Sequence, residues 1–202
     1  MSAQAEALTR CIEEGGVAVF PADTVYGLAC DPLDARAVRR LYALKGRAPD
    51  KPAAVMWFDR ARALAELPDL GQRTRAAFER LTPGGVTLLL PNPDDRFPLA
   101  GGGPTLGVRV PDVPALAETP LVVLQSSANH AGGPDARTLD EVPRDIRDHA
   151  DLVLDAGPLP GTPSTVIDLR DYEDDGRWSV VREGAVAAAE VARCLGIVSG
   201  PP

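Results

Sequence analysis

The chain has 202 residues, of which 45% are hydrophobic and 25% charged, and its formal net charge at pH 7 is -8. Such a length and composition are typical of a globular protein with one well-buried domain or two small ones. The acidic balance argues against a protein that mainly binds nucleic acid through a broad cationic surface, although a local basic pocket is compatible with it.

Twenty proline and nineteen glycine residues are spread along the chain and form no long linker, so we expect one domain over residues 1–202. The first residues lack the basic and apolar regions of a secretory signal, and no apolar run reaches the roughly 18 residues that span a bilayer. The three cysteines are far apart, and only two histidines are present. These features predict reduced thiols, a cytoplasmic location, no membrane partner and no structural metal.

Apolar residues with helical spacing alternate with short apolar runs along the whole chain. The first third predicts a helix over 3–14, a strand over 17–20, a loop over 21–32, a helix over 35–45 capped by Asp34, and a strand over 53–58. There follow helices over 61–66 and 72–81, strands over 86–90, 105–110 and 121–125, a weak helix over 139–149, strands over 152–154, 165–169 and 178–182, and a helix over 187–195. This order favours a single α/β domain around a twisted, mixed sheet.

Three cations, Lys45, Arg47 and Lys51, lie within seven residues of an otherwise acidic chain. Cations at the end of a helix are often a solvated surface feature, because the helix dipole favours them there. Two prolines, Pro49 and Pro52, would fix the shape of this loop, which a solvated surface does not need. Because Arg can bind phosphate through two parallel hydrogen bonds and Lys supplies a point charge, the loop is also a candidate anion site.

Polar residues follow or interrupt several expected strands, and ligands of open α/β sheets bind at strand ends. Ser127 and Asn129 lie in "QSSANHAGGP" after one apolar run, and Arg109 lies inside another, where it needs a partner or solvent. Ser164 begins one strand, and Arg182 ends another. Each of these residues also has an ordinary explanation as a turn or edge residue.

The sequence shows no phosphate-binding P-loop, no dinucleotide fingerprint and no Ser-His-Asp order, and Cys30 has no histidine nearby. We therefore expect no covalent nucleophile among the catalytic groups. The chemistry has to come from anion clamps and hydroxyls, which suit the positioning and charge stabilisation of a phosphoryl or nucleotidyl group.

Seven motifs in order resemble the YrdC-like family, whose best-known members are threonylcarbamoyl-AMP synthases of the TsaC type. They are "PADTVYGLACDP", "LKGRAPDKP", "LTPGGVTLLL", "TLGVRVP", "SSAN", "PSTVID" and "REG", and they span Pro21 to Gly184. The resemblance implies the fold of that family: a single YrdC-like α/β domain in which helices flank a twisted mixed sheet with a large open cavity.

The resemblance also implies an activity. Enzymes of this family form L-threonylcarbamoyladenylate and pyrophosphate from L-threonine, bicarbonate or CO2, and ATP, which makes them nucleotidyltransferases. Their product serves threonylcarbamoyladenosine formation in tRNA by a downstream transferase complex, and tRNA is itself a candidate partner. Mg2+ would arrive bound to ATP and need no dedicated protein cage.

Matching the motifs position by position places the threonine contacts of the family on Thr24, Arg109 and Ser164. The nucleotide contacts fall on Lys45, Arg47, Lys51, Thr105, Ser127, Asn129, Arg137 and Arg182. The chain departs from the family pattern at Ala22, where Thr is common, at Met56, where some members place a polar threonine contact, and at Gly85 and Gln125.

Two alternative functions stay open at this stage. One is an RNA-binding module, because the cavity of the family can be basic, although the acidic composition counts against it. The other is a paralogue that binds nucleotide or RNA without a threonine-specific synthase activity, for which Ala22 and Met56 are the motive. Pyrophosphate release from ATP and bicarbonate with each amino acid in turn would distinguish these functions from the synthase.

Overall fold

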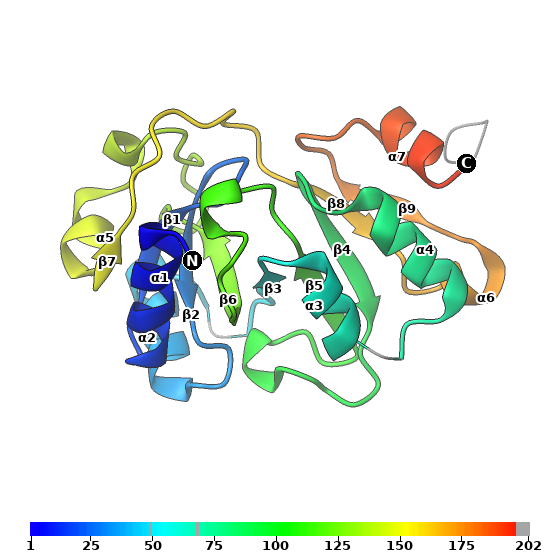
Figure 1. Cartoon of the computed structure of the whole chain (residues 1–202), viewed down its shortest axis with the longest axis horizontal. Coiled ribbons are helices and arrows are strands. Elements are labelled where there is room, and N and C mark those ends of the chain that lie inside the picture. The colour runs from blue at the N-terminus through cyan, green and yellow to red at the C-terminus, as the bar shows by residue number, and fades with distance from the viewer. Residues whose placement is uncertain (49, 68, 197–202) are drawn as a thin grey trace.

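The computed structural model describes residues 1–48, 50–67 and 69–196, which form one nine-stranded sheet with helices around it (Figure 1). The strands lie in the order β7-β1-β2-β6-β3-β5-β4-β8-β9. Their bounds are β1 (Ala18–Pro21), β2 (Tyr26–Cys30), β3 (Ala54–Trp57), β4 (Val86–Pro91), β5 (Thr105–Arg109), β6 (Val122–Ser127), β7 (Leu152–Val153), β8 (Thr165–Asp168) and β9 (Ser179–Arg182). Pro49, which was expected to shape the cationic loop, lies outside the described residues.

The sheet is mixed, as the sequence predicts. Strand β7 runs parallel to β1, β3 to β5, and β4 to β8, whereas the other neighbouring strands pair antiparallel. Strand β6 lies between β2 and β3, so segments far apart in the sequence meet in the middle of the sheet. This middle region carries most of the polar residues that the motifs single out.

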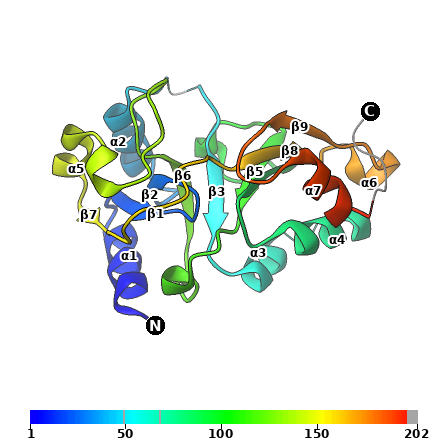
Figure 2. The ribbon, with the colours of Figure 1, turned by 90° about the horizontal axis from the view of Figure 1, so that it is seen from above.

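The helices are α1 (Ala3–Glu13), α2 (Ala35–Lys45), α3 (Arg60–Glu66), α4 (Gln72–Leu81), α5 (Arg144–His149), α6 (Tyr172–Asp175) and α7 (Ala188–Cys194). Figures 1 and 2 show α1, α2 and α5 at one end of the sheet and α3, α4 and α7 at the other. Around β1, Val19 packs in one core cluster with Leu41 of α2, and Phe20 packs in a second cluster with Leu8 of α1. Because successive residues of a strand face opposite sides, α1 and α2 cover opposite faces of this strand.

Helix α2 determines where the cationic loop begins. The Asp34 carboxylate accepts hydrogen bonds from the backbone N–H groups of Arg36 and Ala37, which confirms the predicted N-cap. The helix ends at Gly46, whose φ of 58° is left-handed and therefore favours glycine. This ending turns the chain sharply, so Lys45 stays buried while Arg47 enters the following loop.

Three sequence expectations are wrong in detail. Residues 26–30, expected as part of a loop, form β2, a fully buried strand that pairs with both β1 and β6. The expected helix over 139–149 divides into a short 3-10 turn (Leu139–Glu141) and α5, with Pro143 between them. Helix α6 was not expected. No helix in the described part of the chain is long and apolar enough to cross a membrane.

Candidate functional site

A cavity of about 180 Å3 lies over the middle of the sheet, where the polar ends of several strands meet. It is lined by residues from the turn before β2, the cationic loop, β3 to β6, β8 and β9. Five of the residues singled out by the sequence line it together: Arg47, Arg109, Ser127, Ser164 and Arg182. Apolar side chains, among them Val25 and Val166, complete the wall.

The end of β5 brings Arg109 to this cavity, and the residue is 3% exposed. Its guanidinium donates a 2.8 Å hydrogen bond to the Asp23 carboxylate, and weaker contacts of 3.3 to 3.4 Å join it to the Ala22 carbonyl, the Thr24 hydroxyl and the Gln125 side chain. Within the described residues, its Nε atom is buried without a hydrogen-bond partner. The guanidinium is therefore fixed by its bond to Asp23, while its Nε–H group keeps a hydrogen-bond donor that no described residue uses.

Burial dominates the ionisation of this ion pair. It raises the pKa of Asp23 above its usual value although Arg109 lowers it, and it lowers the pKa of Arg109 although Asp23 raises it. Arg182 lowers the pKa of Arg109 further. Since one internal carboxylate does not offset the cost of burying the guanidinium, a second anion beside Arg109 would be stabilised.

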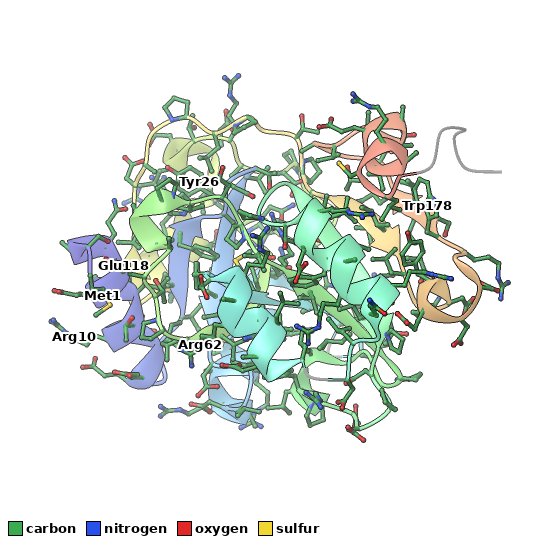
Figure 3. All side chains as sticks on the ribbon, turned by 45° about the vertical axis from the view of Figure 1, so that its right-hand side comes forward. Met1, Arg10, Tyr26, Arg62, Glu118 and Trp178 are labelled. Carbon is green, nitrogen blue, oxygen red and sulfur yellow. The ribbon has the colours of Figure 1, made fainter. Side chains whose placement is uncertain are left out.

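The turn before β2 holds this arrangement in place. Asp23 adopts a left-handed φ of 61°, which is uncommon for a residue other than glycine, and its second carboxylate oxygen accepts a hydrogen bond from the Asp112 backbone N–H. Thr24 is buried, and its carbonyl accepts a hydrogen bond from the Gly161 N–H. Further along, the hydroxyl of Tyr26, which is labelled in Figure 3, lies 2.7 Å from the Asp155 carboxylate and so joins the start of β2 to the segment after β7.

Beside β5 in the sheet, hydroxyl groups from β4 and from the residue before β8 meet a cation of β9. The Ser164 hydroxyl lies 2.8 Å from that of Thr87, and both residues are buried. Arg182 donates a 2.6 Å hydrogen bond to the Ser164 carbonyl and lies 3.3 Å from its hydroxyl. The arrangement offers hydroxyl donors and acceptors next to a positive charge.

The cationic loop forms a third wall through Arg47. Its guanidinium donates to the Pro52 carbonyl and lies 5.8 Å from the ring centre of Tyr42, and its Nε is buried without a hydrogen-bond partner in the described residues. Lys51 is exposed and does not belong to the lining, although its carbonyl accepts a hydrogen bond from the Tyr42 hydroxyl. Of the two loop cations, Arg47 is thus the one aimed at the cavity.

Lys45 is buried beneath the "SSAN" segment. Its ammonium donates to the carbonyls of Ser127 and Asn129, the latter at 2.8 Å, and to the Asn129 side-chain oxygen at 3.0 Å. The same amide oxygen accepts a 2.6 Å hydrogen bond from the Ser127 hydroxyl. Desolvation lowers the pKa of Lys45 to about 8, Arg47 lowers it as well, and Asp135 opposes the shift.

Six predicted residues, among them Lys45 and Lys51, are not in the lining. Thr24 lies behind it, in contact with Arg109, and Asn129 lies behind Ser127. Thr105 starts β5, and the parallel register that pairs Ala54 with Gly107 places it at the same end of the sheet as Lys51. Arg137 is exposed in the loop after "SSAN".

Four side chains of the site were not proposed as contacts from the sequence: Asp23, Thr87, Gln125 and Asp135. Asp23 is part of a quoted motif, and its place directly before the candidate Thr24 was the available signal. Thr87 sits within an apolar run, as Arg109 does, and Gln125 directly follows one, so the criterion applied to Arg109 and to the "SSAN" residues would have identified them.

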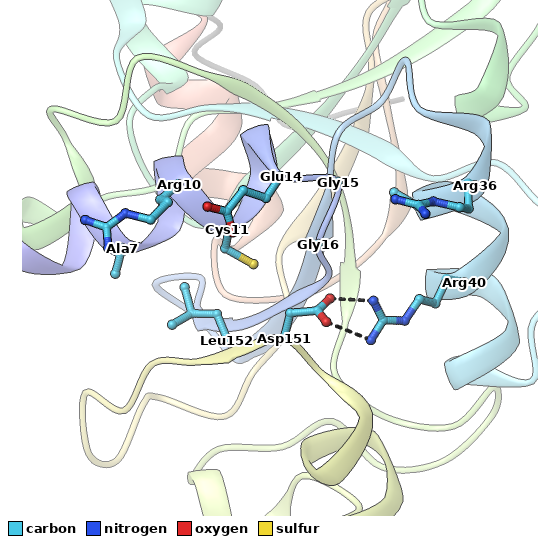
Figure 4. Close-up of a pocket in the computed structure, with 11 residues that line it drawn as sticks. Ala7, Arg10, Cys11, Glu14, Gly15, Gly16, Arg36, Arg40, Asp151 and Leu152 are labelled. Atoms are coloured by element: carbon cyan, nitrogen blue, oxygen red, sulfur yellow. Dashed lines mark hydrogen bonds and ion pairs between the residues drawn. The ribbon is translucent and has the colours of Figure 1, made fainter.

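The expected large open cavity is not confirmed, because the space at these residues is only about 180 Å3. Wider hollows lie elsewhere, and one of about 500 Å3 runs between α1, α2 and the start of β7 (Figure 4). Its lining includes Arg10, Arg36 and Arg40, of which Arg40 is paired with Asp151. Among the residues that the structure describes, none proposed as a ligand contact from the sequence lines that cleft.

Comparison with known proteins gives consistent results. The model of the Sua5/YciO/YrdC family, described as "Telomere recombination", matches residues 10–184. The chain is 37% identical over 181 residues to the threonylcarbamoyl-AMP synthase of Pseudomonas paraeruginosa, covering 83% of this chain and 94% of that protein. It is 36% identical over 180 residues to the enzyme of the same name from Bacillus subtilis, covering 84% of this chain and 50% of the relative.

A solved structure agrees with these relatives. The P. abyssi protein Sua5 complexed with L-threonine superposes with a TM-score of 0.82 at 28% identity, over 96% of this chain and 57% of that one. The chain therefore spans nearly the whole length of some relatives and about half the length of others.

Proposed function

The chain belongs to the Sua5/YciO/YrdC family, and from this premise we propose that it is an L-threonylcarbamoyladenylate synthase. It would join L-threonine, bicarbonate or CO2, and the AMP part of ATP, and release pyrophosphate, as a nucleotidyltransferase does. The threonylcarbamoyl-AMP synthases among its relatives support this activity. The paralogue without threonine specificity is not favoured, because a structure of the family is complexed with L-threonine.

The observation that carries the proposal is the buried, incompletely satisfied guanidinium of Arg109 on the cavity wall. A carboxylate of an amino acid is the anion that suits it, because Arg binds carboxylates through charge-assisted hydrogen bonds. Thr24 contacts the same guanidinium, and Ser164 offers a hydroxyl from the cavity lining. The apolar side chains of Val25 and Val166 suit the methyl group of threonine.

We assign the nucleotide to the side of the cavity that the cationic loop forms. Sites for small molecules usually measure roughly 300–1,000 Å3, so a space of about 180 Å3 suits the amino acid, and the nucleotide extends through the mouth. Arg47 and Arg182, on two sides of the lining, would bind phosphate oxygens. Lys51, Thr105 and Arg137 would contact parts of the nucleotide beyond the lining, and Ser127 would contact it from the end of β6.

The proposed reaction needs no nucleophile from the protein. The neutral threonine amine adds to CO2, releases a proton to solvent and gives a carbamate, whose oxygen attacks the α-phosphorus of ATP, and the bond to pyrophosphate breaks. The side chains of the site position the two reactants and stabilise the charge that develops on the phosphates. Asp135 is the only carboxylate among the described lining residues, so the lining offers few ligands for a metal ion of the protein's own. We therefore propose that Mg2+ would enter bound to the triphosphate, whose charge it would neutralise.

We further propose that the product passes to a downstream transferase complex that modifies tRNA in the cytoplasm. We expect no tight direct binding of tRNA, since the net charge of -8 gives little general attraction to phosphate backbone. A gel shift with unmodified tRNA at physiological salt should show no tight complex. Tight, salt-sensitive binding would instead favour the RNA-binding module.

Pyrophosphate release tests the proposed function. The protein is incubated with ATP, Mg2+, bicarbonate and one amino acid, and the release should depend on threonine. Serine, which lacks only the methyl group, should react about 10- to 200-fold less efficiently, because a methyl in an apolar pocket discriminates no further. Valine should react far less, since it lacks the hydroxyl that Ser164 would bind. Equal rates for threonine and valine, or no pyrophosphate at all, would contradict the proposal.

A further inference from the structure

We propose that Lys45 is a positioning residue, which holds the "SSAN" segment in the shape that binds nucleotide and does not itself bind the phosphates. This inference rests on the proposed function, because it concerns how the site takes ATP. It also changes the role of Lys45, which its motif had placed among the direct nucleotide contacts.

The first argument is the number of hydrogen-bond donors. An ammonium group has three N–H donors, and the structure gives that of Lys45 three acceptors, namely two carbonyls and the Asn129 amide oxygen. The residue is 2% exposed and does not line the cavity. A phosphate oxygen could reach this group only if one of these hydrogen bonds broke and the buried side chain moved.

The second argument is where these hydrogen bonds lead. The amide oxygen of Asn129 accepts from both Lys45 and the Ser127 hydroxyl, and the Asn129 amide nitrogen donates a 2.6 Å bond to the Gly133 carbonyl. The backbone carbonyl of Lys45 in turn accepts a 2.8 Å bond from the Ala131 N–H. Lys45, at the end of α2, therefore holds residues 127–133 through both its side chain and its backbone carbonyl. Within this segment, Ser127 lines the cavity.

The third argument is the charge around this group. Arg47, from the loop after α2, and Asp135, from the loop after β6, are the charged groups that act on Lys45 in the described residues, and they oppose one another. Burial lowers the pKa of Lys45 to about 8. Above this pH the ammonium loses a proton, and with it one of the hydrogen bonds that hold the segment.

A double-mutant cycle tests the inference by calorimetric titration with a non-hydrolysable ATP analogue at pH 7. Lys45→Met and Asn129→Ala should each weaken binding about 10- to 100-fold, and the double variant should be little weaker than either. Arg182→Ala is the matched control, because Arg182 lines the cavity apart from Lys45, so its effect should add to that of Lys45→Met. Additive losses for Lys45→Met and Asn129→Ala would overturn the inference.

A second measurement does not depend on a folded variant. The pKa of Lys45 is followed by NMR of its ε-methylene group, with and without the analogue. A positioning residue should change little, whereas a direct phosphate contact should raise this pKa by about one unit or more. By linkage, the affinity of the wild type for the analogue should then stay nearly constant as the pH rises through 8, whereas a direct phosphate contact would make it fall about tenfold or more and Lys45→Met would show no such fall. A rise of this pKa on binding overturns the positioning role while the synthase proposal stands, and failure of the wild type to bind the analogue overturns both.

Discussion

Asp23 and Arg109 form an ion pair 2.8 Å long between the turn before β2 and the end of β5, with both side chains less than one-tenth exposed. The pair joins the two motifs that the sequence offered separately as threonine contacts. The substrate carboxylate would therefore compete with the Asp23 carboxylate for the guanidinium of Arg109.

The first prediction concerns this internal partner. Asp23→Asn keeps a side chain that tolerates the left-handed φ of 61°, but it leaves the charge of Arg109 without compensation. The stability should fall by about 3–5 kcal/mol, as for other broken buried pairs. Threonine should restore part of this loss, so it should raise the Tm of Asp23→Asn more than that of the wild type.

The control for the backbone is Asp23→Ala, which adds strain at the positive φ and should be less stable than Asp23→Asn. Thermal unfolding with and without threonine gives all these values. A threonine-induced shift in Asp23→Asn that is smaller than in the wild type would mean that Asp23 helps to bind the substrate rather than competes with it.

The second prediction concerns the cationic loop. Arg47→Ala should weaken the binding of an ATP analogue by about 1.5–3 kcal/mol, because it removes a charge-assisted contact from the cavity wall. Lys51→Ala should weaken it less, since Lys51 is exposed and not part of the lining. Arg10→Ala is the control: Arg10 lies in the wide cleft between α1 and α2 (Figure 4). If Arg10→Ala lost affinity and Arg47→Ala kept it, the nucleotide would bind in that cleft.

Lys45 and Arg47 show which features of the site can be predicted from the sequence and which cannot. Both belong to one cationic cluster, and the sequence correctly predicts the Asp34 cap and the end of α2 at Lys45. It does not tell which cation faces the cavity, because the direction of each side chain depends on the left-handed turn at Gly46 and on the "SSAN" segment, more than eighty residues further on. Local patterns predict the elements, whereas contacts between distant segments decide the roles.

Strand β2 gives the same lesson at the level of the fold. Residues 26–30 are continuously buried, so they show no alternation of apolar and polar side chains, and the turn before them suggests a loop. Their strand conformation comes from pairing with β1 and with β6, which lies nearly one hundred residues away. A short apolar run buried on both faces is the pattern that periodicity does not resolve.

The third prediction concerns stability at alkaline pH. The pKa of Lys45 is about 8 in the folded protein and near its ordinary 10.5 in the unfolded chain. Between these values the unfolded chain binds the proton and the folded protein does not, so the contribution of Lys45 to the free energy of unfolding rises with pH. Urea unfolding should show the wild type gaining stability relative to Lys45→Met from about pH 8 to 10.5. A constant difference over this range would mean an unshifted pKa.

The last prediction separates the two substrates. Arg109→Lys keeps a positive charge beside Asp23 but loses the planar guanidinium, and a single ammonium cannot replace its several fixed N–H donors. Since the side-chain contacts of Arg109 include the Thr24 turn and the Gln125 side chain, which we assign to the threonine side, we expect the apparent affinity for threonine to fall about tenfold or more, with ATP binding little changed. Threonine titration by pyrophosphate release and calorimetry with the ATP analogue measure the two effects, and thermal unfolding confirms that the variant is folded. An equal loss of threonine and nucleotide affinity would show that Arg109 serves both substrates, and the assignment of the amino acid to this wall would then be wrong.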